Sequence, residues 1–371
     1  MYIKQLCLVK GGPVEKRKHA MRKQTGKSDS RSVHSKGNTK KIAGKKGCFP
    51  SGTSWLDYLA DHAILPGMLL FSRYGYALAR RFWTEPAETL YGRNVVLTGG
   101  TSGIGKAAAF QLAEKKAFLT IVARNRKKVQ QVQQEIMEKT GNPHVDYLLA
   151  DLSLMKDIAQ VAKALQGKKK SIDILINNAG ALFNERRQTA EGIEQTFATD
   201  LLGVFYLTEL LKNTLARSPG ARIINVASGG MYTQKIVVDD LENRQGLYNG
   251  SKAYARAKRG VVILTRLWAE QLQKNGITVH AMHPGWVDTP GIERALPEFH
   301  AMVNRILRTP DQGADTIVWL AVSEKAGQST GRFWLDRRPH ETVVFPGTGE
   351  SEKERQALWQ KLQDMISQLR D

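Results

Sequence analysis

Short apolar runs alternate along the middle of the chain with longer segments in which apolar residues recur at helical spacing. The short runs predict buried strands at 94–98, 117–123, 145–150, 172–177, 222–227 and 331–335. The periodic segments predict helices at 106–112, 127–139, 155–166 and 311–322. Strands and helices that alternate in this way are typical of a doubly wound parallel sheet. We therefore expect one α/β domain over 93–336, a Rossmann-like sheet of about seven strands with helices on both faces.

A segment of different character precedes this domain. Residues 51–92 hold two apolar stretches at helical spacing, separated by Pro66-Gly67, and predict a helical extension. The longest uncharged apolar run, 63–72, has about ten residues, whereas a membrane-spanning helix needs ~20. No transmembrane segment is therefore predicted. Packing of the extension on the main domain is the favoured interpretation, and a peripheral contact with a membrane surface stays open beside it.

A second extension follows the domain. Residues 337–371 predict a loop and then an amphipathic helix at 352–369, with an apolar face that includes Leu358, Leu362 and Ile366. This helix either folds back on the body of the protein or meets a partner subunit, so a homo-oligomer stays open.

Positive charge is concentrated at the start of the chain. The net charge is +20, and residues 1–50 alone hold 14 basic and two acidic side chains. A segment so poor in apolar residues cannot offset its ordering entropy by burial, and we expect it to be disordered. It could stay solvated, contact anionic lipid or nucleic acid, or act as a transit peptide. Nucleic acid is the least favoured of these partners.

Cysteine usage limits the class of protein and its compartment. Cys7 and Cys48, both in the basic tail, are the only cysteines, so a disulfide scaffold is excluded. A reducing, intracellular setting is expected, either cytoplasmic or peripherally associated with a membrane, and organellar targeting stays open.

A glycine-rich turn, 99–105, joins the first predicted strand to the first predicted helix. This succession is what dinucleotide binding requires, because glycines let the backbone approach the pyrophosphate and the helix N-terminus faces its charge. The spacing from Gly100 to Lys106 also fits a phosphate loop, but Ala107 stands where a magnesium-binding Ser or Thr would be. About 20 residues beyond the turn, Arg124 follows the second predicted strand, and no acidic residue is present to bind a ribose 2′-hydroxyl. An arginine at this place suits a 2′-phosphate and favours NADP(H) over NAD(H).

Two Tyr-x-x-x-Lys pairs follow the predicted strand at 222–227. They are Tyr248 with Lys252 and Tyr254 with Lys258, and on a helix each pair would share one face. A tyrosine has a pKa of ~10 and needs a nearby positive charge to exchange protons at neutral pH. The spacing alone leaves both pairs open as the acid/base group.

The histidines do not predict a metal site. His280 and His283 lie three apart on a predicted strand, where such residues face opposite sides of the sheet. No cysteine or carboxylate cluster joins them.

Six motifs occur in the order and at the intervals typical of the short-chain dehydrogenase/reductase superfamily, which residues 93–336 resemble. They are Thr98-Gly99-x3-Gly103-x-Gly105, Asp151-Leu152, Asn177-Asn178-Ala179-Gly180, Ser228, Tyr-x3-Lys and Pro284-Gly285-x-Val287-x-Thr289. Within the superfamily, the stretches 227–231, 282–291, 312–316 and 329–333 are similar to the branch called dehydrogenase/reductase SDR family member 12. The resemblance implies an oxidoreductase that transfers a hydride between nicotinamide and a carbonyl/alcohol group.

The resemblance also selects one of the two tyrosines. The lysine of the family is followed seven residues later by a helix threonine, which matches Thr265 after Lys258. Tyr254 is then implied as the general acid/base, Ser228 as the partner of the substrate oxygen, and Lys258 as the group that binds the nicotinamide ribose and lowers the tyrosine pKa. The pair Tyr248 and Lys252 would lie at the start of the same helix, near the substrate entrance.

Cofactor contacts are implied by the same resemblance. The turn would meet the pyrophosphate, and Asp151 the adenine. The backbone at 178–180 would line the cofactor, and Val287 and Thr289 would hold its carboxamide. The residues concerned are Gly99, Thr101, Ser102, Gly103, Ile104, Gly105, Arg124, Asp151, Leu152, Asn178, Ala179, Gly180, Tyr254, Lys258, Pro284, Gly285, Val287 and Thr289.

The sequence departs from the family at one catalytic position. Asp200 stands where the family has an asparagine. An aspartate there could still hold a relay water. It would also favour the charged form of Lys258 and oppose formation of the Tyr254 anion, which could reduce activity or displace its pH profile.

The substrate segment is expected between Trp286 and Arg308. Its apolar residues either close the core or cover a hydrophobic carbonyl or alcohol such as a lipid, sterol or retinoid. The leading hypothesis is therefore an NADP(H)-dependent oxidoreductase acting on such a small molecule. The alternatives are an NADP-binding regulator with little turnover, motivated by Asp200, and a protein tethered to membrane or nucleic acid through its basic N-terminus.

Overall fold

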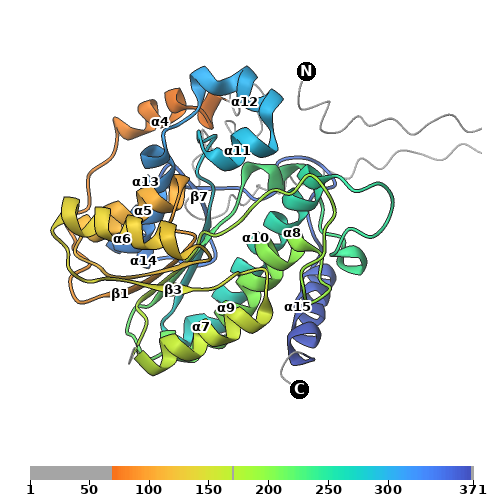
Figure 1. Cartoon of the computed structure of the whole chain (residues 1–371). Helices are drawn as coiled ribbons and strands as arrows, with labels where there is room; N and C mark the ends of the chain where they lie inside the picture. Colours follow the sequence, from red (N-terminus) through yellow and green to blue (C-terminus); the bar gives the residue numbers. More distant parts are fainter. Residues whose placement is uncertain (1–68, 169–170, 369–371) are drawn as a thin grey trace, which may run out of the picture. The chain divides into compact units, whose positions relative to one another are not determined.

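The computed structural model describes residues 69–168 and 171–368. The predictions for the basic tail and for the first apolar stretch of the N-terminal extension fall outside these residues. The described part belongs to one compact unit, and its path is drawn in Figure 1.

Eight strands of the described residues form a single sheet in the order β3-β2-β1-β4-β5-β6-β7-β8. Seven of them run parallel, and the order reverses between β1 and β4, which is the switch point where open α/β sheets bind ligands. The strands are β1 (Asn94–Thr98), β2 (Phe118–Ala123), β3 (Val145–Leu149), β4 (Ile174–Asn177), β5 (Arg222–Val226), β6 (Thr278–Met282), β7 (Phe333–Leu335) and β8 (Arg338–His340).

The sheet agrees with the expected parallel sheet of about seven strands and adds a short eighth strand at its edge. Strand β8 pairs antiparallel with β7, in a segment that was predicted as a loop. The two residues between them, Asp336 and Arg337, both have positive φ, 52° and 60°, as in the tight turns of two-residue hairpins. Such turns usually contain Gly or Asn. Because this one contains neither, no local pattern predicts a hairpin here.

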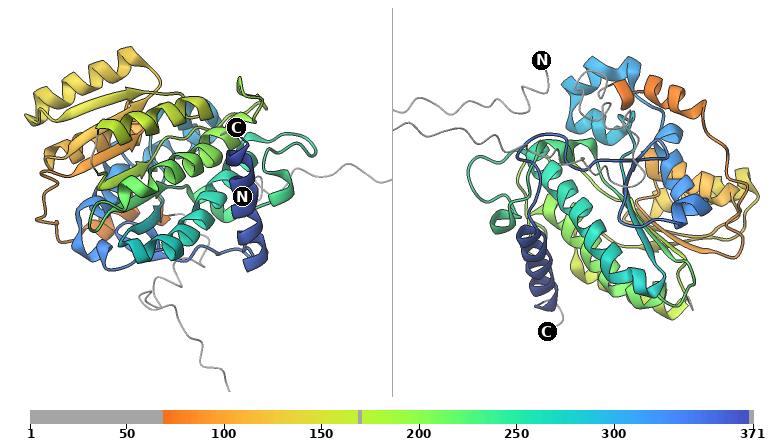
Figure 2. Two further views of the ribbon diagram at one scale, coloured as in Figure 1. Left: turned by 90° about the horizontal axis from the view of Figure 1, so that it is seen from below. Right: turned by 180° about the vertical axis from the view of Figure 1, so that it is seen from behind.

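Helices cover both faces of the sheet, as the alternating pattern predicts (Figures 1 and 2). One apolar core lies under α7 (Met155–Lys168), α9 (Gly203–Leu215) and α10 (Gly250–Leu272). A second lies on the opposite face, under α5 (Gly103–Glu114), α6 (Arg126–Thr140) and α13 (Pro310–Val322). The remaining helices are α4 (Arg73–Arg80), α8 (Gln195–Phe197), α11 (Pro290–Ala295), α12 (Pro297–Val303), α14 (Glu324–Gly327) and α15 (Glu352–Ser367). Single turns are η1 (Ala198–Leu202), η2 (Gly229–Thr233), η3 (Val238–Asp240), η4 (Gln273–Asn275) and η5 (Asn304–Ile306).

The C-terminal helix α15 packs on the protein's own body. Leu358 and Leu362 are fully buried, and the Trp359 ring meets Phe205 of α9 at 5.1 Å and Trp268 of α10 at 6.2 Å. A capping box between Ser351 and Glu354 starts the helix. Of the two alternatives that the amphipathic pattern left open, the structure shows the fold-back.

The described part of the N-terminal extension also packs on the body. Helix α4 buries Gly75 and Tyr76, and the Tyr76 hydroxyl donates to Asp315 at 3.4 Å. In Figures 1 and 2, α4 lies beside α11 and α12. In the part of the chain that the structure describes, no helix is both long enough and apolar enough to span a membrane.

Candidate active site

The turn between β1 and α5 brings backbone close to backbone. Gly99 and Gly103 have φ of +73° and +51°, a region that side chains disfavour. A side chain on Gly105 would collide with the Gly99 carbonyl. Helix α5 begins at Gly103, so its free N–H groups face outward at the switch point of the sheet. This geometry suits a bound pyrophosphate.

Thr98 ties this turn to the end of β4, a role that the motif did not reveal. Its hydroxyl accepts hydrogen bonds from the backbone N–H groups of Asn178 (2.9 Å) and Ala179 (3.0 Å). In return, the Asn178 amide donates to the carbonyls of Thr98 (2.8 Å) and Gly99 (3.2 Å). Because these residues satisfy one another's hydrogen-bonding groups, the ends of β1 and β4 keep a fixed separation at the switch point.

Asp200 and Lys258 form a buried ion pair at the centre of the site. Lys258 Nζ lies 3.2 Å from Asp200 Oδ1, and it also donates to the Val226 carbonyl at 3.2 Å. Asp200 is fully buried and accepts from the backbone N–H of Ala181 at 3.1 Å. It projects from η1, a π-helical turn that interrupts the helix running from α8 into α9. Such turns frequently mark functional positions.

Burial dominates the electrostatics of Asp200. Removal from water raises its pKa to about 6, against the opposing effects of Lys258 and of the Ala181 N–H. For Lys258, burial lowers the pKa but the negative charge of Asp200 raises it, and the net direction is upward. The pair is therefore ionised at neutral pH. A side chain on Gly180 would collide with Asp200 and approach Lys258 Nζ to 2.8 Å, so this position requires a glycine.

Tyr254 lies one turn before Lys258 on α10, with Lys258 Nζ 5.5 Å from the centre of its ring. A hydrogen bond with Ser228 and the charge of Lys258 both lower the Tyr254 pKa, but burial raises it by more, and Asp200 raises it further. Lys258 thus lowers the Tyr254 pKa as expected, but the larger effect of burial leaves this pKa above its ordinary value. Ser228 also caps η2, where its hydroxyl accepts from Gly230 N at 3.3 Å.

The second tyrosine has different surroundings. Tyr248 precedes Asn249, the residue that caps α10, so it lies outside the helix and not at its start as expected. Its hydroxyl bonds Thr196 at 2.8 Å and Glu194 at 3.1 Å, and burial raises its pKa to about 12. Lys252 is exposed. The structure thus brings Ser228, Tyr254, Lys258 and Asp200 together and holds Tyr248 in a separate polar cluster.

The other cofactor candidates lie around the same sheet edge. Arg124 is exposed at the end of β2. Asp151 accepts from the Ser153 N–H (2.9 Å) and hydroxyl (2.7 Å), so its carboxylate is held in place. Val287 is buried, and Thr289 caps α11 with its methyl group beside Gly103 of the turn.

The histidines serve the core. The His280 ring accepts from the Trp334 indole at 3.0 Å and also meets the Ala326 carbonyl at 3.0 Å, and burial lowers its pKa to about 4. Burial likewise lowers the pKa of His283 to about 3. Within the described ranges, no group of three His, Cys, Asp or Glu side chains could hold a metal ion.

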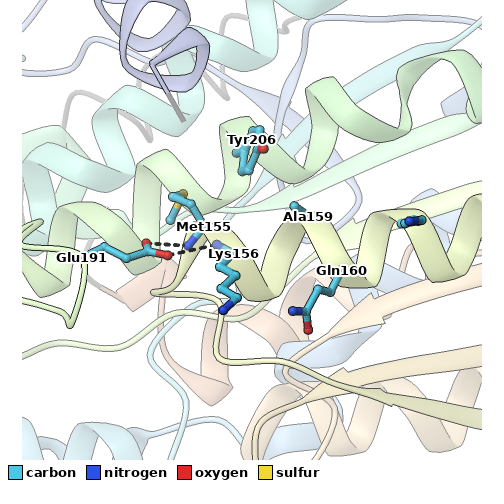
Figure 3. A pocket seen from close by; sticks show the side chains of 7 residues that line it. Met155, Lys156, Ala159, Gln160, Glu191 and Tyr206 are labelled. Atoms are coloured by element: carbon cyan, nitrogen blue, oxygen red, sulfur yellow. Dashed lines mark hydrogen bonds between the residues drawn. The ribbon is translucent and has the colours of Figure 1, made fainter. Parts of the chain in front are cut away.

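A surface hollow elsewhere on the molecule carries none of this chemistry. It is lined by residues of α7, by Tyr206 of α9 and by Glu191 (Figure 3). The Glu191 carboxylate accepts from the backbone N–H groups of Met155 (2.7 Å) and Lys156 (3.0 Å), which caps the start of α7. This is a structural arrangement at a helix end.

Comparison with known proteins places this geometry in a family. The short chain dehydrogenase family model matches residues 93–298. Dehydrogenase/reductase SDR family member 12 of Homo sapiens is 37% identical over 306 residues, which cover 82% of this chain and 95% of that protein. Retinol dehydrogenase 13 of Homo sapiens is 32% identical over 258 residues, 66% of this chain and 77% of that protein.

A solved structure shows the same fold. L-sorbose reductase from Gluconobacter frateurii, in complex with NADPH and L-sorbose, is 23% identical and has a TM-score of 0.56. The match covers 66% of this chain and 95% of that chain, and at this identity it supports the fold alone. Taken with the family model and the relatives, the chain belongs to the short chain dehydrogenase family and is an oxidoreductase that acts on CH–OH donors.

Proposed function

We propose that the protein is an NADP(H)-dependent oxidoreductase acting on a hydrophobic carbonyl/alcohol pair, with Tyr254 as its general acid/base. The observation that carries the proposal is the cluster of Ser228, Tyr254, Lys258 and Asp200 at the carboxyl edge of the sheet, next to a turn that admits a pyrophosphate. The cofactor, when bound, supplies or accepts the hydride.

Each residue of the cluster has a task that follows from its contacts. Tyr254 would give its hydroxyl proton to a carbonyl oxygen during reduction and take it back during oxidation. Ser228, already within hydrogen-bond reach of that hydroxyl, would orient the substrate oxygen. Lys258 holds a positive charge beside the phenol and thereby favours its anion.

The preference for NADP(H) rests on the second strand. Strand β2 ends at Ala123 and is followed by the exposed Arg124, where an NAD-binding protein would carry an acid for the ribose 2′-hydroxyl. A guanidinium at this place can pair with the 2′-phosphate of NADP. The adenine would meet the segment at Asp151 and Leu152, and the carboxamide the segment from Pro284 to Thr289.

A hydrophobic substrate is favoured by the aromatic residues of the substrate segment. The rings of Trp286 and Phe299 meet edge to face at 5.4 Å, and Phe71 adds a third ring against Trp286 at 5.8 Å. Aromatic side chains such as these line sites that bind apolar molecules. Retinol, which is named in one of the relatives, is a suitable first alcohol to test.

The test is a comparison of two tyrosine variants in the full chain. NADPH and NADH are titrated first, and NADPH oxidation is then followed against a panel of hydrophobic aldehydes and ketones. Tyr254→Phe should abolish turnover while cofactor binding persists, and Tyr248→Phe, the matched control, should retain turnover. Binding without turnover across the panel would favour the alternative of an NADP-binding regulator. Failure to bind either cofactor would refute both.

We further propose that the exposed side of residues 73–82, which include α4, contacts an anionic membrane surface. Tyr74, Leu78 and Phe82 recur every four residues, and each exposes more than half of its side chain. The segment 69–83 carries three arginines and no acid. An exposed apolar stripe bordered by positive charge is typical of helices that lie in a membrane interface.

This contact is tested by flotation of the full chain with vesicles of phosphatidylcholine, with and without phosphatidylserine. Replacing the three stripe residues by Ser should abolish association with the anionic vesicles. The control replaces Met137 and Leu247, two exposed apolar residues of other segments, in the same way. Equal flotation of both variants would refute the contact.

A further inference from the structure

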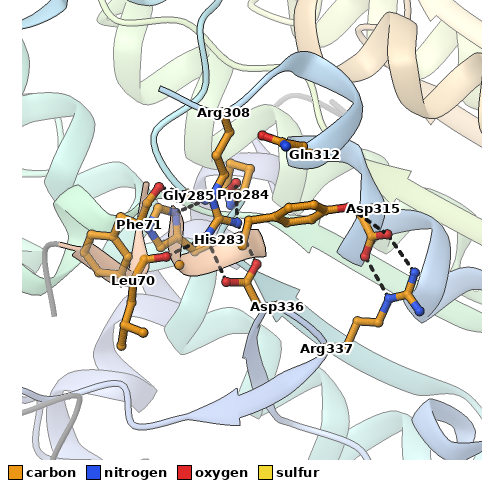
Figure 4. A network of polar contacts seen from close by, with 12 residues as sticks. Leu70, Phe71, His283, Pro284, Gly285, Arg308, Gln312, Asp315, Asp336 and Arg337 are labelled. Carbon is orange, nitrogen blue, oxygen red and sulfur yellow. Dashed lines mark hydrogen bonds and ion pairs between the residues drawn. The ribbon is translucent and has the colours of Figure 1, made fainter. Parts of the chain in front are cut away.

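One buried guanidinium holds the N-terminal strap, defined here as residues 69–72, against the body. The Arg308 side chain is only 1% exposed. It donates to the backbone carbonyls of Leu70 (2.6 Å) and Phe71 (3.1 Å), which are labelled in Figure 4. It also donates to the carbonyl of Ser72 at 3.2 Å. It also forms a two-pronged ion pair with Asp336 of the β7–β8 turn, at 2.6 and 2.8 Å. A planar fork of donors is what makes this many simultaneous bonds possible.

The backbone of the same arginine closes the substrate segment, residues 286–308. Arg308 N–H donates to the Trp286 carbonyl at 2.7 Å, and Asp288 N–H donates to the Arg308 carbonyl at 2.9 Å. The strap joins this closure directly, since Trp286 N–H donates to the Phe71 carbonyl at 2.8 Å. The two ends of the substrate segment and the strap therefore meet at one point.

The Phe71 side chain links the candidate catalytic serine to the substrate segment. Its ring meets His283 edge to face at 4.6 Å and Trp286 at 5.8 Å, and Trp286 continues to Phe299 of α12. The His283 ring in turn lies against Gly229. A Cβ atom added to Gly229 would come within 2.8 Å of His283 Nε2.

The position of Gly229 fixes where this aromatic row begins. Gly229 directly follows Ser228, and Phe71 also packs on the small apolar cluster that contains Ala227 and Met231. The row from His283 to Phe299 therefore starts beside Ser228 and ends at the substrate segment.

We infer that the N-terminal strap forms the outer wall of the substrate site and that Phe71 determines the size of substrate that the site accepts. The inference rests on the proposed oxidoreductase function. Phe71 lies outside residues 93–298, the segment that the family model matches, so the strap is not part of the matched domain. The bonds from Arg308 reach the main chain of the strap, so a different side chain at position 71 leaves those bonds in place.

The experiment compares Phe71→Ala with Tyr91→Ala in the full chain. Tyr91 belongs to the same extension but is 72% exposed, and its ring meets Phe118 of β2. Both variants and the wild type are assayed for kcat/KM with NADPH against aldehydes that range from short aliphatic to polycyclic. In Phe71→Ala, the ratio of kcat/KM for large over small aldehydes should rise about tenfold, because small substrates lose an apolar contact and large ones gain room.

Two further variants make the outcome decisive. Phe71→Leu keeps an apolar side chain, so it should fold even if the alanine variant does not, and it should shift the same ratio by a smaller factor. Arg308→Lys keeps phenylalanine at position 71 but removes the guanidinium that holds the strap. Because the strap is then held less firmly, the ratio of kcat/KM for large over small aldehydes should shift in the same direction. Unchanged size profiles in the Phe71 variants, in chains that bind NADPH and turn over aldehydes, would overturn the inference. Absence of turnover in the wild type would instead count against the proposed function.

Discussion

Replacing Asp200 by Asn tests the electrostatics of the site with the smallest change in shape. The substitution removes one buried negative charge and keeps an oxygen that can accept from the Ala181 N–H. It also restores the residue type that the family carries at this position. We expect turnover to be preserved or raised, because the negative charge of Asp200 raises the pKa of Tyr254 and opposes formation of its anion.

The size of the effect follows from two distances. Lys258 Nζ lies 3.2 Å from Asp200 Oδ1 and 5.5 Å from the centre of the Tyr254 ring, so the carboxylate lies within about 9 Å of that ring. At an effective dielectric constant of about 20, a unit charge at this distance acts with roughly 2 kcal/mol. Because one pH unit corresponds to about 1.4 kcal/mol, the limb of the pH profile that reports Tyr254 should move to lower pH by about one unit.

The assay is kcat/KM for alcohol oxidation as a function of pH. Asp200 has a pKa of about 6, so the comparison is made above that pH, where the wild-type carboxylate is ionised. Asp239→Asn, an exposed aspartate on η3, makes the same change in charge away from the site and should leave the profile in place. A shift toward higher pH would refute the reasoning, since it would mean that Asp200 acts mainly by keeping Lys258 protonated. A large loss of turnover would give the aspartate a role of its own.

Three other predictions follow from single features of the structure. Arg124→Ala should weaken NADPH binding about tenfold and leave NADH binding unchanged in a fluorescence titration. Lys128→Ala, an exposed lysine in the first turn of α6, should change neither. Gly105→Ala should abolish cofactor binding in the same titration because the added methyl collides with the turn, while Gly167→Ala, which meets open space, should bind normally. Burial lowers the pKa of His280 from 6.5 to about 4, so the unfolded chain takes up the proton first. Protonation of His280 alone should therefore remove about 3 kcal/mol of stability in urea as the pH drops through that window. His280→Gln should make the dependence shallower by this amount, while the part that comes from His283 should remain.

Local sequence patterns predicted the parts of the molecule that depend on neighbours along the chain. The alternation of apolar runs and periodic segments predicted the parallel sheet, and the glycine turn predicted the close approach at Gly105. Spacing alone left both Tyr-x-x-x-Lys pairs open, and only the family resemblance selected Tyr254; the structure holds Tyr248 in a different cluster.

The remaining features depend on residues far apart in the sequence. An arginine in a loop is expected to be exposed, and the burial of Arg308 requires three carbonyls more than 230 residues away in the chain. The β7–β8 turn lacks the usual glycine, so its hairpin has no local signal. Desolvation of Tyr254, which outweighs the effect of Lys258, arises only when the surrounding elements have packed.

The docking of α15 has a consequence for assembly. Leu358, Leu362 and Ile366 are at most 2% exposed, and burial of three such side chains stabilises the docked helix by roughly 5–9 kcal/mol. A second copy of the chain that approached the same face of α9 and α10 would have to displace this helix and expose those residues to water. The docked helix thus competes with a second copy for that surface, and association through this face requires α15 to leave it.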